Sequence, residues 1–198
     1  LGSEATTWQS AQPCVYFSQG LQPRMGKDLR KDINYAWSYQ GEIFSSLKNA
    51  TRPWMGPKFW CPGMKSSSDA NNYKVFRYAG ALLLKAEALC ELGSNAESVR
   101  YLNMTRNRAG LDDYVFRTNV RLQEEIRLER ARELFGEFQR KFDLVRWGIW
   151  YKSVVEYCDY GTLLNNVLPC HRYYPIPDTQ VVYSKYNLDN DEYAQYGM

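Results

Sequence analysis

Residues 121–148 read RLQEEIRLERARELFGEFQRKFDLVRWG, and this stretch carries the strongest structural pattern in the chain. Its apolar side chains recur at alternating spacings of three and four residues, which lines one face of an α-helix. The positions in this stripe are Leu128, Ala131, Phe135, Phe138, Phe142 and Val145. Gly148 stands where a helix commonly takes a left-handed C-terminal residue. The pattern predicts one long helix over 121–148, with the stripe facing the core.

A second pattern on the same stretch is a ridge of carboxylates. The ridge residues repeat every four positions, so like charges would stack along one side of the helix and repel one another. Interleaved basic residues nearly balance them, which favours a buried or half-buried ion-pair network over a patch for nucleic acid. The residues expected in this structural network are Glu129, Glu133, Glu137, Arg106, Arg108, Arg130 and Arg140.

Enzymatic interpretations of the same carboxylates are less favoured. A carboxylate metal site in a helical bundle needs a Glu-x-x-His pair on each of two helices, and the single histidine, His171, lies outside the predicted helices. Glycoside cleavage needs two carboxyls that face each other across a substrate, whereas these share one ridge. No nucleophile-elbow, zinc-peptidase, dinucleotide or phosphate-loop motif occurs in the sequence. We therefore predict no catalytic residue, no metal site and no cofactor.

Residues 73–108 predict a helical hairpin. A helix over 73–92 carries an apolar face so wide that it must contact helices on two sides. Ser94 and Glu97 have the spacing of a capping box, which would start a further helix over 96–108. A stop and a start this close make the two helices antiparallel, as in one unit of a tetratricopeptide array. The predicted fold class is mainly α: a tetratricopeptide-like hairpin packed on a long helix, with loop-rich irregular segments.

The composition argues against two classes of protein. A net charge of +3 is too small to indicate a nucleic-acid partner, and no apolar run approaches the ~20 residues of a membrane-spanning helix. The first residues, LGSEATTWQS, lack a basic region followed by an apolar core, so we do not expect a signal peptide there.

The five cysteines show no CxxC spacing. The sequence leaves undecided whether Cys158 and Cys170, which flank a short loop, form a disulfide.

Residues 1–70 form a loop-rich segment, which we expect to belong to the same domain as the helical region 71–198. Five prolines interrupt any helical period here, and four of the six tryptophans lie in this segment. Tyr35, Trp37 and Tyr39 alternate with other residues, so a strand would project three aromatic rings from one face. Most of the rings in this segment are expected to fill the core, whereas an exposed ring with a polar edge would suit a stacked ligand.

Three ordered stretches resemble the C-terminal part of the SusD/RagB family. They are FRYAGALLLKAEALCELG with YLNMTRNRAGL, then IRLERARELFGEFQRKFDLVRWG, then YYPIPDTQVVYSKYNLDNDEY. Their order and spacing also agree with the family, and GPKFW at 56–60 is similar to its short Lys-aromatic segment. The resemblance covers about residues 56–193. The departures are Gly136, shifted against the usual Glu-Gly pair, Gln180 in place of Glu, and Asp191-Glu192 in place of Pro-Gly.

The resemblance implies a binding protein and not an enzyme. Family members are glycan-capturing lipoproteins on the outer surface of certain Gram-negative bacteria, where they hold an oligosaccharide for import. The implied partners are that oligosaccharide and a SusC-like TonB-dependent transporter, with no nucleic acid. The implied location is the extracellular face of the outer membrane, through a lipid anchor that lies outside this chain. The surface around the Tyr-rich tail is expected to dock the transporter.

The remaining expectations concern the ligand site and the alternative function. Trp8, Trp37 and Tyr39 are the likeliest platform for an oligosaccharide, because exposed indole and phenol rings match the apolar face of a pyranose and loops place them at the surface. The alternative function is a tetratricopeptide-like adaptor that binds peptides, and a carboxylate-metal enzyme is less favoured.

Overall fold

The computed structural model describes residues 27–36, 38–39, 42–43, 54–55, 58, 74–158, 161–184 and 188–197. The chain divides into two compact units, Leu1–Arg140 and Lys141–Met198. The domain boundary expected at residue 70 lies outside the described residues.

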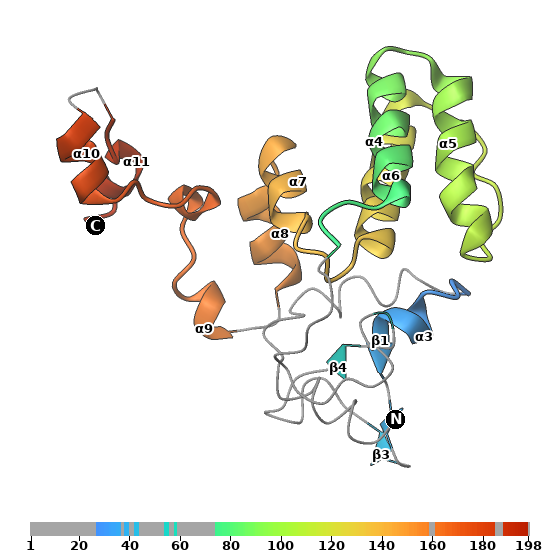
Figure 1. The fold of residues 1–198 in the computed structure, drawn as a ribbon, viewed down its shortest axis with the longest axis horizontal. Helices are drawn as coiled ribbons and strands as arrows, with labels where there is room; N and C mark the ends of the chain where they lie inside the picture. The colour runs from blue at the N-terminus through green and yellow to red at the C-terminus, as the bar shows by residue number, and fades with distance from the viewer. Residues whose placement is uncertain are drawn as a thin grey trace. The chain divides into compact units, whose positions relative to one another are not determined.

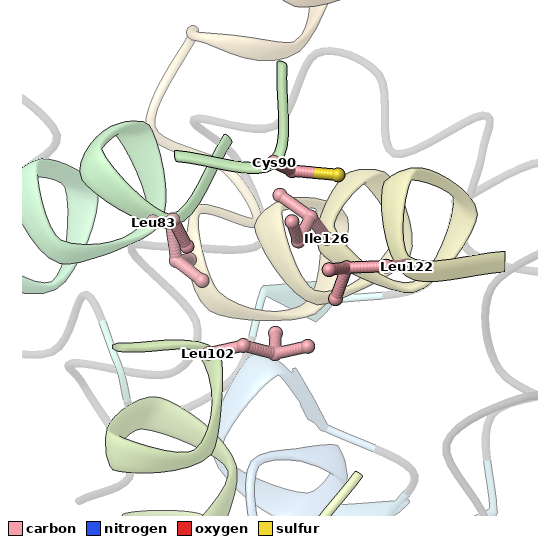
Figure 2. Close-up of a cluster of buried hydrophobic side chains, with 6 residues drawn as sticks. Leu83, Cys90, Leu102, Leu122 and Ile126 are labelled. Carbon is pink, nitrogen blue, oxygen red and sulfur yellow. The ribbon is translucent and has the colours of Figure 1, made fainter. Parts of the chain in front are cut away.

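Three helices form the body of the first unit: α4 (Tyr78–Glu91), α5 (Asn95–Arg108) and α6 (Asn119–Glu133). Helices α4 and α5 form an antiparallel hairpin, and both contact α6 (Figure 1). The core between them consists of six buried residues, most of them aliphatic, which meet from the three helices (Figure 2). They are Leu83, Ala86, Cys90, Leu102, Leu122 and Ile126. The predicted fold class, a mainly α protein with a helical hairpin packed on a further helix, is confirmed.

The start of each hairpin helix differs from its prediction. The first helix begins at Tyr78 rather than at residue 73. Ser94 does occupy the N-cap position of α5, but its side chain makes no capping hydrogen bond, so the predicted capping box is wrong. The reason is the backbone of Ser94, whose φ of -79° and ψ of 59° lie outside the extended region that capping residues usually adopt. Buried Ser98 instead ties the helices together, because its hydroxyl donates to the carbonyl of Ala86 at 2.6 Å.

The long helix predicted over 121–148 is wrong, because α6 ends at Glu133 and α7 (Arg140–Arg146) begins after a turn. Two residues in that turn are left-handed, Gly136 with φ 72° and Phe138 with φ 58°. The turn breaks the helical period, so the predicted apolar stripe does not form one face: Phe138 is 74% exposed and Phe142 is 68% exposed.

Short elements precede the helical body in the first unit. Helix α3 (Lys31–Asn34) leads directly into β1 (Tyr35–Ala36), which pairs with β4 (Trp54–Met55) in an antiparallel ladder. Strand β2 (Ser38–Tyr39) pairs in the same sense with β3 (Glu42–Ile43).

The second unit is made of short helices. They are the rest of α7, then α8 (Trp150–Tyr157), α9 (Gly161–Leu164), η3 (Pro169–Arg172), α10 (Asp178–Ser184) and α11 (Asp191–Ala194). Gly148 after α7 has φ 69°, the left-handed conformation that the sequence predicts there. Cys158 and Cys170 are buried and carry free thiols in this structure. Across the described residues of both units, no helix combines the length and the apolar character that crossing a membrane requires.

Candidate functional site

Buried charged side chains from several parts of the chain meet at the C-terminal end of α6. Glu129, Glu133 and Glu137 are 0%, 2% and 8% exposed. The first two lie one helical turn apart, which aims both carboxylates to the same side of α6. Like charges at this spacing repel, and burial removes the water that would screen them, so the site is stable only if cations surround it.

Arg30 is the central cation of this site. Its guanidinium makes five hydrogen bonds to carboxylates, which uses every N–H donor that an arginine has. It is bidentate to Asp28, at 2.9 and 2.6 Å, and bidentate to Glu129, at 2.7 and 3.1 Å. The fifth bond reaches Glu133 at 2.8 Å. Burial alone would lower the pKa of Arg30, but the bonds to Asp28 and Glu129 outweigh it and raise the pKa above its ordinary value.

Two further cations reach the site from residues that precede the hairpin. Arg77 is bidentate to Glu137, at 2.9 and 2.6 Å, and contacts Glu133 at 3.1 Å. The ammonium of Lys58 lies 2.6 Å from a carboxylate oxygen of Glu137. Burial opposes the charged form of Glu137, yet the hydrogen bond from Arg77 and the charge of Lys58 lower the pKa of this carboxyl. Burial also lowers the pKa of Lys58, and the charge of Glu137 opposes that change.

The same side chains satisfy the open carbonyls at the end of α6. The last carbonyls of a helix have no partner within the helix, and the helix dipole favours positive charge near them. Lys58 donates to the carbonyls of Glu133 and Phe135 at 2.8 and 2.9 Å, and Arg77 donates to that of Glu133 at 2.9 Å. The side-chain amide of Asn34 donates to the carbonyl of Arg132 at 2.9 Å. Side chains distant in sequence therefore cap α6.

The arginines expected as partners occupy different places. Arg108 contacts Glu133, as the network required, whereas Arg106 contacts Glu125. Arg140 donates to the backbone carbonyl of Arg127 at 3.1 Å. Arg130 is buried on α6.

Sequence reasoning missed the three cations that hold most of the site, which are Arg30, Lys58 and Arg77. They lie 99, 75 and 56 residues from their partners on α6, and helical periodicity carries no information over such distances. Two local signals exist: the Lys-aromatic segment GPKFW contains Lys58, and Arg77 is the second residue of the stretch FRYAGALLLKAEALCELG.

The site is a network of ion pairs with a structural role. Every carboxylate oxygen of Asp28, Glu129, Glu133 and Glu137 accepts a hydrogen bond or ion pair from an arginine or lysine. Among the residues that the structure describes, no group of three His, Cys, Asp or Glu side chains is arranged to hold a metal ion. The arrangement can fasten separate segments of the chain to α6.

The structure describes little of the three residues that are expected to bind a glycan. Trp8 and Trp37 are outside the described residues, and only the backbone of Tyr39 is described, in β2. Their role stays a prediction.

Comparison with known proteins places the chain in a family. The sequence model of the SusD family matches residues 8–196. SusD-like protein P25 of Formosa agariphila is 32% identical over 179 residues, which is 83% of this chain and 31% of that protein. The chain is also similar in structure to a SusD superfamily protein from Bacteroides vulgatus, with a TM-score of 0.60, 28% identity and coverage of 78% of this chain and 37% of the other.

A SusD homolog from Bacteroides thetaiotaomicron is similar as well, with a TM-score of 0.57, 31% identity and coverage of 82% of this chain and 37% of the other. The chain thus spans about a third of the length of these relatives. The family match begins at Trp8, well before the stretches in which motifs are evident, and it runs almost to the last described residue. The chain belongs to the SusD family.

Proposed function

We propose that this chain is part of a cell-surface protein that binds an oligosaccharide and passes it to a TonB-dependent transporter, and that it is not an enzyme. The observation that carries the proposal is the family match over residues 8–196. The geometry of the α6 site agrees with a binding protein, because its carboxylates are engaged by cations and serve as structural ties.

The glycan would stack on rings from the segment before the hairpin, with Trp8, Trp37 and Tyr39 as the platform. Tyr39 lies in β2, where its backbone pairs with that of Glu42 in β3. An aromatic ring offers flat apolar area to a pyranose while its polar edge stays in water.

Glycan-array screening of the protein, followed by titration of the best glycan, tests the binding function. Trp37→Ala and Tyr39→Ala should each weaken binding by about tenfold or more, which corresponds to ~1.4 kcal/mol. Tyr183→Ala is a matched control, because Tyr183 is an exposed tyrosine on α10 in the other unit. Variants that bind as tightly as the parent would place the platform elsewhere, and an array without any bound glycan would refute the function.

The transporter is the proposed protein partner, and the outer membrane is the proposed location. The Tyr-rich tail supports this choice, because exposed Tyr173, Tyr174 and Tyr183 give its surface the aromatic character of many protein interfaces. Co-purification of the protein with a TonB-dependent transporter from native outer membranes is the test. Repeated isolation of the protein alone would count against the partnership.

The hairpin α4–α5 keeps one competing function open, a tetratricopeptide-like adaptor for peptides. An adaptor of this kind would be cytoplasmic and reduced, and it would bind an extended or helical peptide rather than a glycan. Fractionation of cells into cytoplasm and outer membrane separates the two functions.

A further inference from the structure

The side chain of Lys141 contacts two aromatic rings of the second unit and no carboxylate of the described chain. Its ammonium lies 3.9 Å from the ring centroid of Tyr174 and 5.6 Å from that of Trp150. The lysine is half-buried at the start of α7. Among the residues that the structure describes, its side chain forms no ion pair and no hydrogen bond. A partly buried positive charge is therefore left without a counterion in this unit.

The other cations that lie over rings in this unit are balanced by carboxylates. Two arginines are placed 4.8 and 5.0 Å from the centroids of aromatic rings. Of these, Arg146 pairs with Asp143 at 2.9 Å, and Arg172 pairs with Glu192. An aromatic ring attracts a cation through its quadrupole but carries no net charge. The rings around Lys141 consequently leave its charge available to an anion from a ligand.

The ring of Tyr174 is exposed, although its backbone is held in place. The residue is 79% exposed. On one side of it, the hydroxyl of Tyr193 donates to the carbonyl of Tyr173 at 2.6 Å. On the other side, the Asn190 side chain accepts from the N–H of Ile176 at 2.8 Å and donates to its carbonyl at 2.9 Å. The two prolines of this segment restrict the backbone further. An exposed ring on a fixed backbone loses little conformational freedom when a ligand stacks on it.

An exposed ring beside an unbalanced ammonium suits a sugar that carries a carboxylate. The apolar face of a pyranose can stack on the ring, and the ammonium can donate charge-assisted hydrogen bonds to the carboxylate. At 3.9 Å apart, the ammonium of Lys141 and the ring of Tyr174 are close enough to contact one sugar residue together. A neutral sugar would leave the ammonium unpaired, and a simple carboxylate would leave the ring without a stacking partner.

We propose that Lys141 and Tyr174 bind a uronate residue of an acidic oligosaccharide, with Trp150 beside the ammonium. This site is separate in sequence from the platform expected in residues 1–70. The unbalanced cation is independent of the proposed function, whereas the choice of a sugar as the ligand rests on it. Tyr173 is left to the transporter, because its backbone is extended and successive side chains of an extended segment point to opposite sides.

NMR titration of the full 198-residue chain with defined oligosaccharides tests the site. The signal to follow is the indole N–H of Trp150, which the Trp150→Phe variant assigns. The probes are the trimers of galacturonate, glucuronate and mannuronate, each compared with its neutral counterpart, the trimer of galactose, glucose or mannose. At least one uronate trimer should shift the indole signal and bind about tenfold more tightly than its neutral counterpart, which lacks the charge-assisted bonds. Raising the ionic strength from about 0.05 M to about 0.5 M should weaken that binding.

Variants separate the contributions of the charge and the ring. Lys141→Gln should weaken binding of the uronate trimer about tenfold, whereas Lys141→Arg keeps the charge and should stay within about threefold of the parent. Tyr174→Ala should also lose about tenfold, whereas Tyr174→Phe keeps the stacking face and should lose little. Lys152→Gln is the matched control, because it removes the same charge from an exposed lysine on α8 in the same unit. This control should bind as the parent does.

Three results would overturn the site. One is the absence of any shift of the indole signal with all three uronate trimers, and another is undiminished uronate binding by Lys141→Gln. The third is equally tight binding of a triglutamate peptide, which would favour a carboxylate of a protein partner over a sugar. A parent that binds neutral glycans on the array but no uronate trimer refutes this site alone, whereas an array without any bound glycan refutes the proposed function.

Discussion

Arg30→Met should strongly destabilise the first unit, because it removes the cation from a buried cluster of three carboxylates. Methionine approximates the apolar stem of arginine but has no N–H donors. Five hydrogen bonds to Asp28, Glu129 and Glu133 are lost at once. Glu133 keeps its contacts with Arg77 and Arg108, whereas Asp28 loses both of its side-chain bonds to Arg30.

The expected magnitude follows from burial on both sides of the contact. The side chain of Arg30 is 7% exposed and those of Asp28 and Glu129 are fully buried. Removing one partner of such a pair costs about 3–5 kcal/mol, because the remaining charge is left buried without compensation. A domain of ordinary stability unfolds with a free energy of only about 5–15 kcal/mol. Arg30→Lys should recover only part of the loss, since a lysine cannot form the two bidentate pairs.

Urea unfolding at pH 7, followed by circular dichroism, measures the effect. Arg121→Met is the matched control, because the side chain of Arg121 is 68% exposed and pairs with exposed Glu124 on the same helix. Exposed pairs of this kind contribute little, so the control should keep the midpoint of the parent. If Arg30→Met moves the urea midpoint no further than Arg121→Met does, the buried network does not stabilise the fold as argued.

Four other outcomes are expected. Phe138→Gly should be more stable than Phe138→Ala by about 1 kcal/mol in thermal unfolding, because φ is 58° there and left-handed L-residues are strained; a more stable alanine variant would refute this. The pKa of Glu137 is lowered in the folded protein, so its pairing stabilises the fold above the unfolded pKa of about 4.3. This stabilisation is lost as the pH falls through the folded pKa, and Glu137→Gln should therefore flatten the acid limb of a curve of stability against pH. An unchanged acid limb in Glu137→Gln would argue against this pairing. Tyr114→Phe should be neutral or slightly stabilising, because the buried hydroxyl has no hydrogen-bond partner among the described residues, and a loss above ~1 kcal/mol would reveal one. Glu133→Gln should lower the free energy of unfolding by more than it lowers the free energy of glycan binding, because Glu133 is part of the structural network. If elemental analysis instead finds a stoichiometric transition metal that is lost in this variant, an enzyme is favoured.

Much of the helical body could be predicted because its signals are local. The apolar positions of α4 and α5 repeat within each helix, and Gly93 and Gly110, both left-handed, follow the helix ends. The family could be recognised for a related reason, since its motifs are short runs in a set order. The placement of the candidate ligand rings stays a prediction, and a weakly founded one, because loop backbones have no period that would place a side chain.

The sequence by itself determined that α6 would present a ridge of carboxylates in need of cations, because that requirement follows from spacing along one helix. Only the tertiary structure decided which cations pair with these carboxylates. Arg30 and Glu129 are 99 residues apart, and chain reversals that no local pattern encodes bring them together. The exposure of Phe138 was decided in the same way: a turn at Gly136 ends the helix, and the apolar spacing that continues through the turn no longer describes one face.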